Sequence, residues 1–136
     1  MTPATVKRSR KRPQRQLRSV VVEALEDMKA VNVKVLDVRG LTDITDTMVI
    51  ASGTSDRHVR SVADRVLEKA REAGVRPFGI EGERDGEWVL VDLPDVLVHI
   101  MLPRVRELYG LEKLWDSGAV TPQGAAAAPA ARVVEV

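Results

Sequence analysis

Two adjoining strand-like stretches dominate the hydrophobic pattern of this chain. The segment EWVLVDLPDVLVHIML predicts strands at 87–93 and 96–102, joined by a tight turn at Pro94 and Asp95. Side chains alternate between the two faces of a strand. One face of this hairpin is therefore wholly aliphatic and is expected to be core: Val89, Val91, Val98 and Ile100.

The opposite face of the same hairpin is chemically mixed, and we call it the mixed face. A two-residue turn would place Leu90 opposite His99 and Trp88 opposite Met101. An indole, an imidazole, a thioether and a carboxylate together are more typical of a surface that meets a partner than of core. Burial under a helix of the same domain is the alternative. The mixed face consists of Trp88, Leu90, Asp92, Leu97, His99 and Met101.

Apolar residues at helical spacing predict two longer helices. The first runs from Leu17 to Met28, and the second from Val59 to Ala70, with Gly74 placed to end it in the left-handed conformation. A third, short helix is expected after Pro103, which suits a first-turn position.

The remaining apolar runs complete one mixed sheet. Strands are predicted at 34–38, 48–51 and 78–81, and the last two flank a helix, so they should run parallel. Asp85-Gly86 is a hairpin signal that leads into the segment starting at residue 87. The predicted fold is α/β with α+β character: a five-stranded mixed sheet flanked by helices, in the order α-β-β-α-β-β-β-α.

Charge divides the chain into a basic arm and an acidic body. Residues 1–18 hold seven bases and no acid, which leaves 14 bases against 20 acids, a net charge of −6, in residues 19–136. Composition predicts a disordered basic arm at 1–14, a single domain at 15–117 and a disordered Ala/Pro-rich tail at 118–136. Such an arm either is attracted to phosphate without reading sequence or is simply a solvated tail.

Composition also excludes several classes of protein. Cysteine is absent, which rules out disulfides, thiolate zinc sites and cysteine nucleophiles. No apolar run approaches the ~20 residues of a membrane span, and no signal-peptide pattern opens the chain, so a cytoplasmic protein without membrane contact is expected. Aromatic residues make up 3%, too few for a base-stacking platform.

Catalytic and metal-binding patterns are weak. The two histidines, His58 and His99, form no His-x-x-x-His pair, and there is no Gly-x-Ser-x-Gly elbow. Residues 52–55, Ser-Gly-Thr-Ser, could cradle an anion at a helix start, but capping explains them equally simply. A minimal nucleotidyltransferase would use this turn with Glu81 and Glu83, although these two carboxylates flank a glycine in a predicted loop. No catalytic residue, cofactor or metal ligand is assigned.

Three blocks of the sequence resemble a known family. They are DITDTMVIASGTSDRHVRSVADRV at 43–66, FGIEGERDGEWVLVDLPDVLVHIM at 78–101 and RELYGLEKLW at 106–115. They resemble the Iojap family, the bacterial ribosomal silencing factor RsfS, over about residues 20–117. The resemblance implies a fold related to nucleotidyltransferases but without known catalysis. It also implies binding to protein fourteen of the large ribosomal subunit, which blocks subunit joining and slows translation when nutrients are scarce.

This resemblance gives the mixed face and the acidic body a role. A negative body suits a partner rich in Arg and Lys, and the basic arm is expected to touch rRNA beside it. The resemblance implies a monomer on the ribosome and a homodimer when free. A minimal nucleotidyltransferase and a large-subunit assembly factor remain the alternatives. The candidate partner-binding residues are Trp88, Leu90, Asp92, His99, Met101, Tyr109 and Trp115.

Overall fold

From the first helix to the last, the helices and strands follow the predicted order α-β-β-α-β-β-β-α. The computed structural model describes residues 13–111, 113 and 132–133. The helices are α2 (Pro13–Asp27), α3 (Asp56–Glu72) and α4 (Pro103–Tyr109). The strands are β1 (Val31–Asp37), β2 (Thr47–Ser52), β3 (Gly79–Glu81), β4 (Trp88–Leu93), β5 (Val96–Met101) and β6 (Arg132–Val133).

The strands form one mixed sheet in the order β3-β4-β5-β2-β1-β6. Its central pair, β2 and β5, is parallel, and every other neighbouring pair is antiparallel. Strands β2 and β3 run in the same direction, as predicted, although β5 and β4 lie between them. The five predicted strands are confirmed. The sixth, β6, comes from the predicted tail and pairs Arg132 and Val133 with β1.

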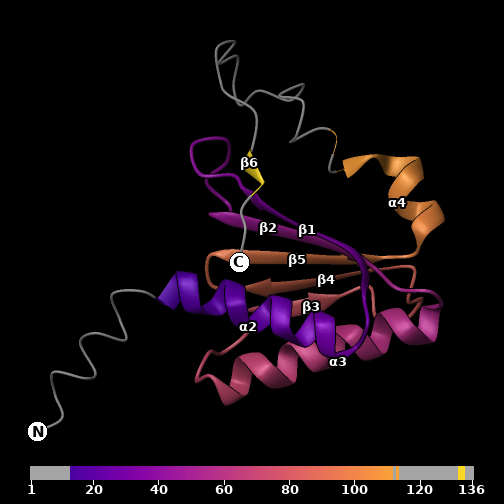
Figure 1. Cartoon of the computed structure of the whole chain (residues 1–136), viewed down its shortest axis with the longest axis horizontal. Coiled ribbons are helices and arrows are strands. Elements are labelled where there is room, and N and C mark those ends of the chain that lie inside the picture. The colour runs from indigo at the N-terminus through magenta and orange to yellow at the C-terminus, as the bar shows by residue number, and fades with distance from the viewer. Residues whose placement is uncertain (1–12, 112, 114–131, 134–136) are drawn as a thin grey trace, which may run out of the picture.

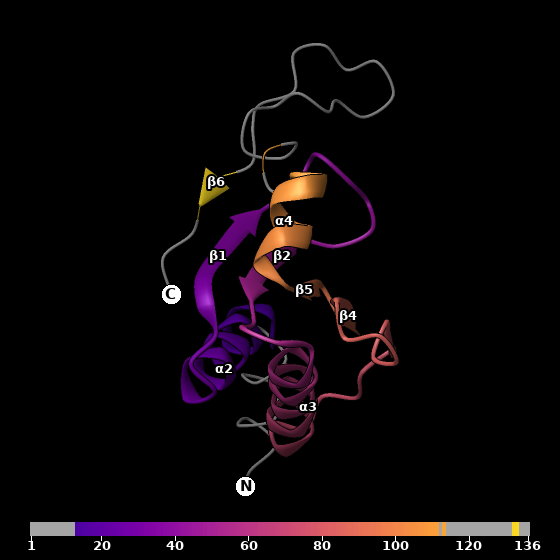
Figure 2. The ribbon, with the colours of Figure 1, turned by 90° about the vertical axis from the view of Figure 1, so that its right-hand side faces the viewer.

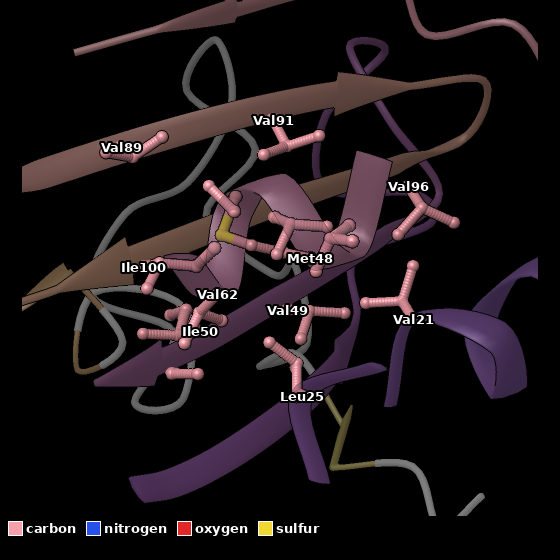
Figure 3. Close-up of a cluster of buried hydrophobic side chains, with 14 of the residues drawn as sticks. Val21, Leu25, Met48, Val49, Ile50, Val62, Val89, Val91, Val96 and Ile100 are labelled. Atoms are coloured by element: carbon pink, nitrogen blue, oxygen red, sulfur yellow. The ribbon is translucent and has the colours of Figure 1, made fainter. Parts of the chain in front are cut away.

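The helices lie on both sides of the sheet. Figures 1 and 2 show α2 and α3 side by side on one face, and Figure 2 shows α4 on the opposite face. The core fills the space between the sheet and the α2–α3 layer, where Val21 and Leu25 meet the aliphatic face of the strands (Figure 3). The predicted aliphatic core face is confirmed, since its four residues are fully buried: Val89, Val91, Val98 and Ile100.

The start of α3 explains the Ser-Gly-Thr-Ser turn. Ser55 is the N-cap, and its Oγ accepts a hydrogen bond from the backbone N–H of His58 at 3.1 Å. The imidazole of His58 accepts from the N–H of Thr54 at Nδ1, 2.9 Å away, and donates from Nε2 to the carbonyl of Met28 at 2.7 Å. His58 therefore joins the start of α3 to the end of α2. At the other end of α3, Gly74 adopts the predicted left-handed conformation, with φ +82°.

The β4–β5 hairpin has the predicted two-residue turn and register. Leu90 pairs with His99 and Trp88 pairs with Met101. Asp95 takes a positive φ of 63°, and its carbonyl accepts the N–H of Thr47 at 3.1 Å, which ties the turn to the start of β2. In the part of the chain that the structure describes, no helix is both long and apolar enough to cross a membrane.

Gly82, at the end of β3, has no room for a side chain. Its φ is +87°, and a Cβ there would overlap the carbonyl oxygen of Trp88. We expect Gly82→Ala to lower the free energy of unfolding by about 2 kcal/mol or more, because strain and overlap add. Gly79→Ala is the matched control, since a Cβ at Gly79 meets nothing within 4 Å. Urea unfolding of both variants measures the difference, and equal losses would contradict this account.

Candidate functional site

The mixed face lies on the side of the sheet that carries α4, since its Trp88 packs against Tyr109 of that helix. Strand β4 supplies Trp88, Leu90 and Asp92, and the antiparallel register sets them beside the side chains of β5 on the same face. Helix α4 begins directly after β5 and ends at Gly110, which adopts the left-handed conformation and donates its N–H to the carbonyl of Arg106. The face is therefore bordered by α4, and only part of it is covered.

Trp88 links the sheet to α4. Its Nε1–H donates to Nδ1 of His99 at 3.0 Å, and the two rings are 5.8 Å apart between centroids. On its other side the indole packs against Tyr109 of α4, with centroids 5.1 Å apart and planes inclined by 51°. Tilted aromatic pairs at this distance are favourable beyond the area they bury. The half-buried indole is thus held in one orientation by two elements.

His99 supports Trp88 from beneath the surface. Its side chain is 6% exposed, and because Nδ1 accepts from the indole, the ring proton sits on Nε2. Burial lowers the pKa of His99 from 6.5 to about 4, because the charged imidazolium would lose its hydration. The imidazole is therefore neutral at physiological pH and acts here as a hydrogen-bond acceptor.

Exposure separates the candidate residues into two groups. Met101 is fully buried and His99 nearly so, so both support the face without presenting an accessible surface. Trp88, Leu90 and Asp92 are half-buried. Tyr109 is 59% exposed on α4. The structure brings these six candidates to one side of the sheet, whereas Trp115 lies outside the described residues.

Two further apolar side chains are highly exposed, Leu108 and Ile44. Leu108 of α4 is 76% exposed, whereas Val105, three residues before it, is buried. Ile44, in the loop between β1 and β2, is 79% exposed. A single apolar residue among Thr and Asp, as Ile44 is, could have signalled this exposure. Leu108 adjoins Tyr109 and extends the exposed apolar surface along α4.

Two carboxylates rim the mixed face at the outer edge of the sheet. Glu81 of β3 pairs with Leu90, and Asp92 pairs with Gly79, so both carboxylates project from the same face as Trp88. Glu81 and Glu83 are exposed. Within the described ranges, no group of three or more His, Cys, Asp or Glu side chains could hold a metal ion. The arrangement can present an apolar centre with an acidic border to a basic partner.

The depressed pKa of His99 makes the stability of the fold depend on pH. Above pH 6.5 the imidazole is neutral in both folded and unfolded chains and contributes no pH dependence. As pH falls from 6.5 through about 4, the unfolded chain binds a proton that the folded chain does not, so the free energy of unfolding decreases. We expect His99 to account for roughly 3 kcal/mol of that decrease.

The variant His99→Gln keeps an acceptor for the indole but removes the titration. Urea unfolding of both proteins at pH 7 and near pH 4 isolates the contribution of His99, since the carboxylates titrate in both. An NMR titration of the imidazole in the unsubstituted protein measures its pKa directly. The same decrease in both proteins, or a midpoint near 6.5, would show that His99 is not buried as described.

Comparison with known proteins places the whole body of this chain in one family. Residues 11–134 match the family described as "Ribosomal silencing factor during starvation", RsfS. A ribosomal silencing factor RsfS of Chromobacterium violaceum is 46% identical over 100 residues, covering 74% of this chain and 82% of the relative. The mouse "Mitochondrial assembly of ribosomal large subunit protein 1" is 35% identical over 99 residues, covering 71% of this chain and 43% of the relative. A crystal structure of a Chromobacterium violaceum protein superposes with a TM-score of 0.74 at 44% identity, covering 84% of this chain and 93% of that one. With this family match and these shared lengths, the chain belongs to the RsfS family.

Proposed function

We propose that this chain is a translational repressor that binds the large ribosomal subunit through its ribosomal protein fourteen. Bound there, it sterically blocks association with the small subunit, notably under nutrient limitation, and it acts in the cytoplasm without catalysis. Membership of the RsfS family supports the ribosomal partner. The observation that carries the proposal is the mixed face, where Trp88 is fixed between His99 and the exposed ring of Tyr109.

The geometry of Trp88 suits an anchor for a protein partner. Aromatic residues dominate the binding energy of many interfaces, most of all near the centre of the patch. Because His99 and Tyr109 already hold the indole, little side-chain entropy remains to be lost on binding. Leu90 beside it and Leu108 on α4 extend the apolar area, as interface cores require.

Charge supports the choice of a basic partner. Glu81 and Asp92 border the apolar centre, and residues 19–136 carry a net charge of −6. A ribosomal protein that binds rRNA is rich in Arg and Lys, so the two surfaces attract each other. Such complementarity mainly accelerates and orients the encounter. The aromatic centre slows dissociation and so lengthens the lifetime of the complex.

Two alternatives remain open to experiment. The printed name of the mouse relative favours a large-subunit assembly factor that uses the same docking surface. Binding to immature but not mature subunits would select that role. A minimal nucleotidyltransferase using Glu81 and Glu83 would show metal-dependent nucleotide turnover. The proposed protein is a monomer on the ribosome and a homodimer when free, which sedimentation of each state measures.

Removing the aromatic pair should weaken binding to the large subunit. We expect Trp88→Ala and Tyr109→Ala each to lower the binding free energy by about 2 kcal/mol, because both rings lie at the centre of the proposed contact. Co-sedimentation with purified large subunits measures affinity, and subunit joining in the same mixture measures the block. Tyr109 is the sharper test because it is 59% exposed, so truncating it disturbs the core little.

Phe78→Ala is the matched control for this test. Phe78 is 71% exposed, but it precedes β3 and lines a hollow with Leu17 of α2, on the side of the sheet away from α4. It should therefore leave binding unchanged. Normal binding by folded Tyr109→Ala and Trp88→Ala variants would exclude the mixed face as the docking surface.

The basic arm is proposed to contact rRNA near the docking site. Residues 1–12 lie outside the described residues, and they carry Lys7, Arg8, Arg10, Lys11 and Arg12. Removing them leaves α2, which starts at Pro13, intact. We expect weaker binding and a salt dependence whose slope decreases by about 0.7 to 0.9 for each lost phosphate contact. An arm of equal length with these five bases replaced by Gln is the control for length. Unchanged affinity and unchanged salt slope would rule out the rRNA contact.

A further inference from the structure

A second site lies between the sheet and α4, away from Trp88. The pocket has a volume of about 500 Å³, within the range of small-molecule sites. Its floor is formed by Lys34 of β1 and Ser52 of β2, and its wall by Arg106 and Glu107 of α4. Figure 2 shows how α4 lies above these strands. None of these residues belongs to the mixed face.

The position of this pocket in the sheet is one that favours ligands. Strands β2 and β5 are the parallel pair, and both end here, at Ser52 and Met101. From these ends the chain departs to opposite faces, into α3 on one side and α4 on the other (Figure 2). A crevice opens outside the carboxyl ends of parallel strands where successive connections leave to opposite sides of the sheet, and ligands bind there in many α/β proteins.

The strand that lines the pocket is locally irregular. The register of β1 against β2 shifts between Val31 and Lys34, which is a bulge or a related irregularity. Within it Asn32 adopts φ 51°, in the left-handed region, and Asn32 lines the pocket. Bulges redirect side chains and occur preferentially next to functional sites, where strained backbone also concentrates. The register shift lies between the pairs Val31–Ser52 and Lys34–Ile50, and both Lys34 and Ser52 line the pocket.

The lining of the pocket is basic within an acidic body. Three cationic residues line it, Lys34, Arg106 and Lys113, and Glu107 is the one carboxylate among the described lining residues. Arg106 donates to the Oγ of the buried Ser52 at 3.0 Å, which holds the guanidinium at the floor. Guanidinium and ammonium groups that converge on a concave site are suited to phosphate. An uncharged ligand would gain no electrostatic attraction from this lining.

We infer that this pocket binds the phosphate groups of a small molecule, with a nucleoside diphosphate or triphosphate as the ligand class of matching charge and size. Arg106 and Lys34 would contact the phosphates from two sides, and Lys113 would close the site from the residues that follow α4. The lining of the site does not include Tyr109, whose ring packs on Trp88. The inference goes beyond the proposed ribosomal function and does not depend on it.

Binding to the isolated full-length protein tests the inference without ribosomes. Isothermal titration calorimetry is run with ATP, GTP, inorganic pyrophosphate and adenosine as probes. We expect the phosphorylated probes to bind with dissociation constants below about 1 mM and adenosine not to bind. Tighter binding of ATP or GTP than of pyrophosphate would identify a nucleotide as the source of the phosphates, and equal binding would identify free polyphosphate.

Matched variants locate the binding. Lys34→Gln and Lys113→Gln should each weaken ATP binding by about tenfold, because each removes one cation from the lining. Arg104→Gln is the control: it makes the same charge change on α4 at a residue outside the lining, where Arg104 faces Glu87 at 3.6 Å. Amide NMR spectra establish that each variant is folded. No binding of any phosphorylated probe, equal binding of adenosine, or equal loss in Arg104→Gln would overturn the inference. So would tighter binding of a short RNA strand than of ATP.

Discussion

The arrangement of this molecule depends on the parallel pairing of β2 with β5 at the centre of the sheet. All six residues of β2 are buried, so the strand is covered on both faces and cannot be shifted without exposing apolar surface. Parallel pairing brings the ends of both strands to one edge, and the chain leaves that edge toward opposite faces. Helix α3 completes the core on one side, while α4 reaches the other side and supplies Tyr109 and Arg106. Both candidate sites therefore exist because of one strand pair.

In the mixed face, the buried imidazole of His99 has a structural role. An imidazole inside a sheet would normally lose its hydration without compensation, and His99 recovers one hydrogen bond from the indole of Trp88. That bond orients the indole, and Tyr109 packs on the same ring. A purely aliphatic face would be more stable but would offer no oriented aromatic surface. The chemical mixture along β4 and β5 is thus a single unit in which each side chain positions the next.

Sequence periodicity was sufficient to predict the five main strands, the three helices and the register of the hairpin. These features depend on the local spacing of apolar and polar residues and on a two-residue turn, both of which can be recognised in the sequence. The extent to which each side chain is buried was harder to predict from the sequence. Met101 and Trp88 share a face and a register pair, yet Met101 is fully buried and Trp88 only partly buried. Met101 lies on β5, between β4 and β2, whereas β4 has only the three-residue edge strand β3 on its outer side. Strand β6 was not predicted, since it has only two residues and its pairing partner, β1, is far away in the chain. Leu108 lies three residues after the buried Val105 but is 76% exposed, so helical spacing alone did not reveal its exposure.

The turn at Pro94 and Asp95 also constrains how this sequence can diverge. Side chains alternate with a period of two, so an inserted residue in this turn that shifted the strand by one position would exchange the two faces of β4 relative to β5. The valines would then point away from the helices, and Trp88 would enter the core. The loop between Glu81 and Trp88 is restricted at both of its glycines, because Gly82 and Gly86 have positive φ and a Cβ at either would overlap neighbouring atoms. Its residues 83–85 are exposed. We therefore expect a one-residue insertion to cost more in the turn between β4 and β5 than among the exposed residues 83–85 before β4.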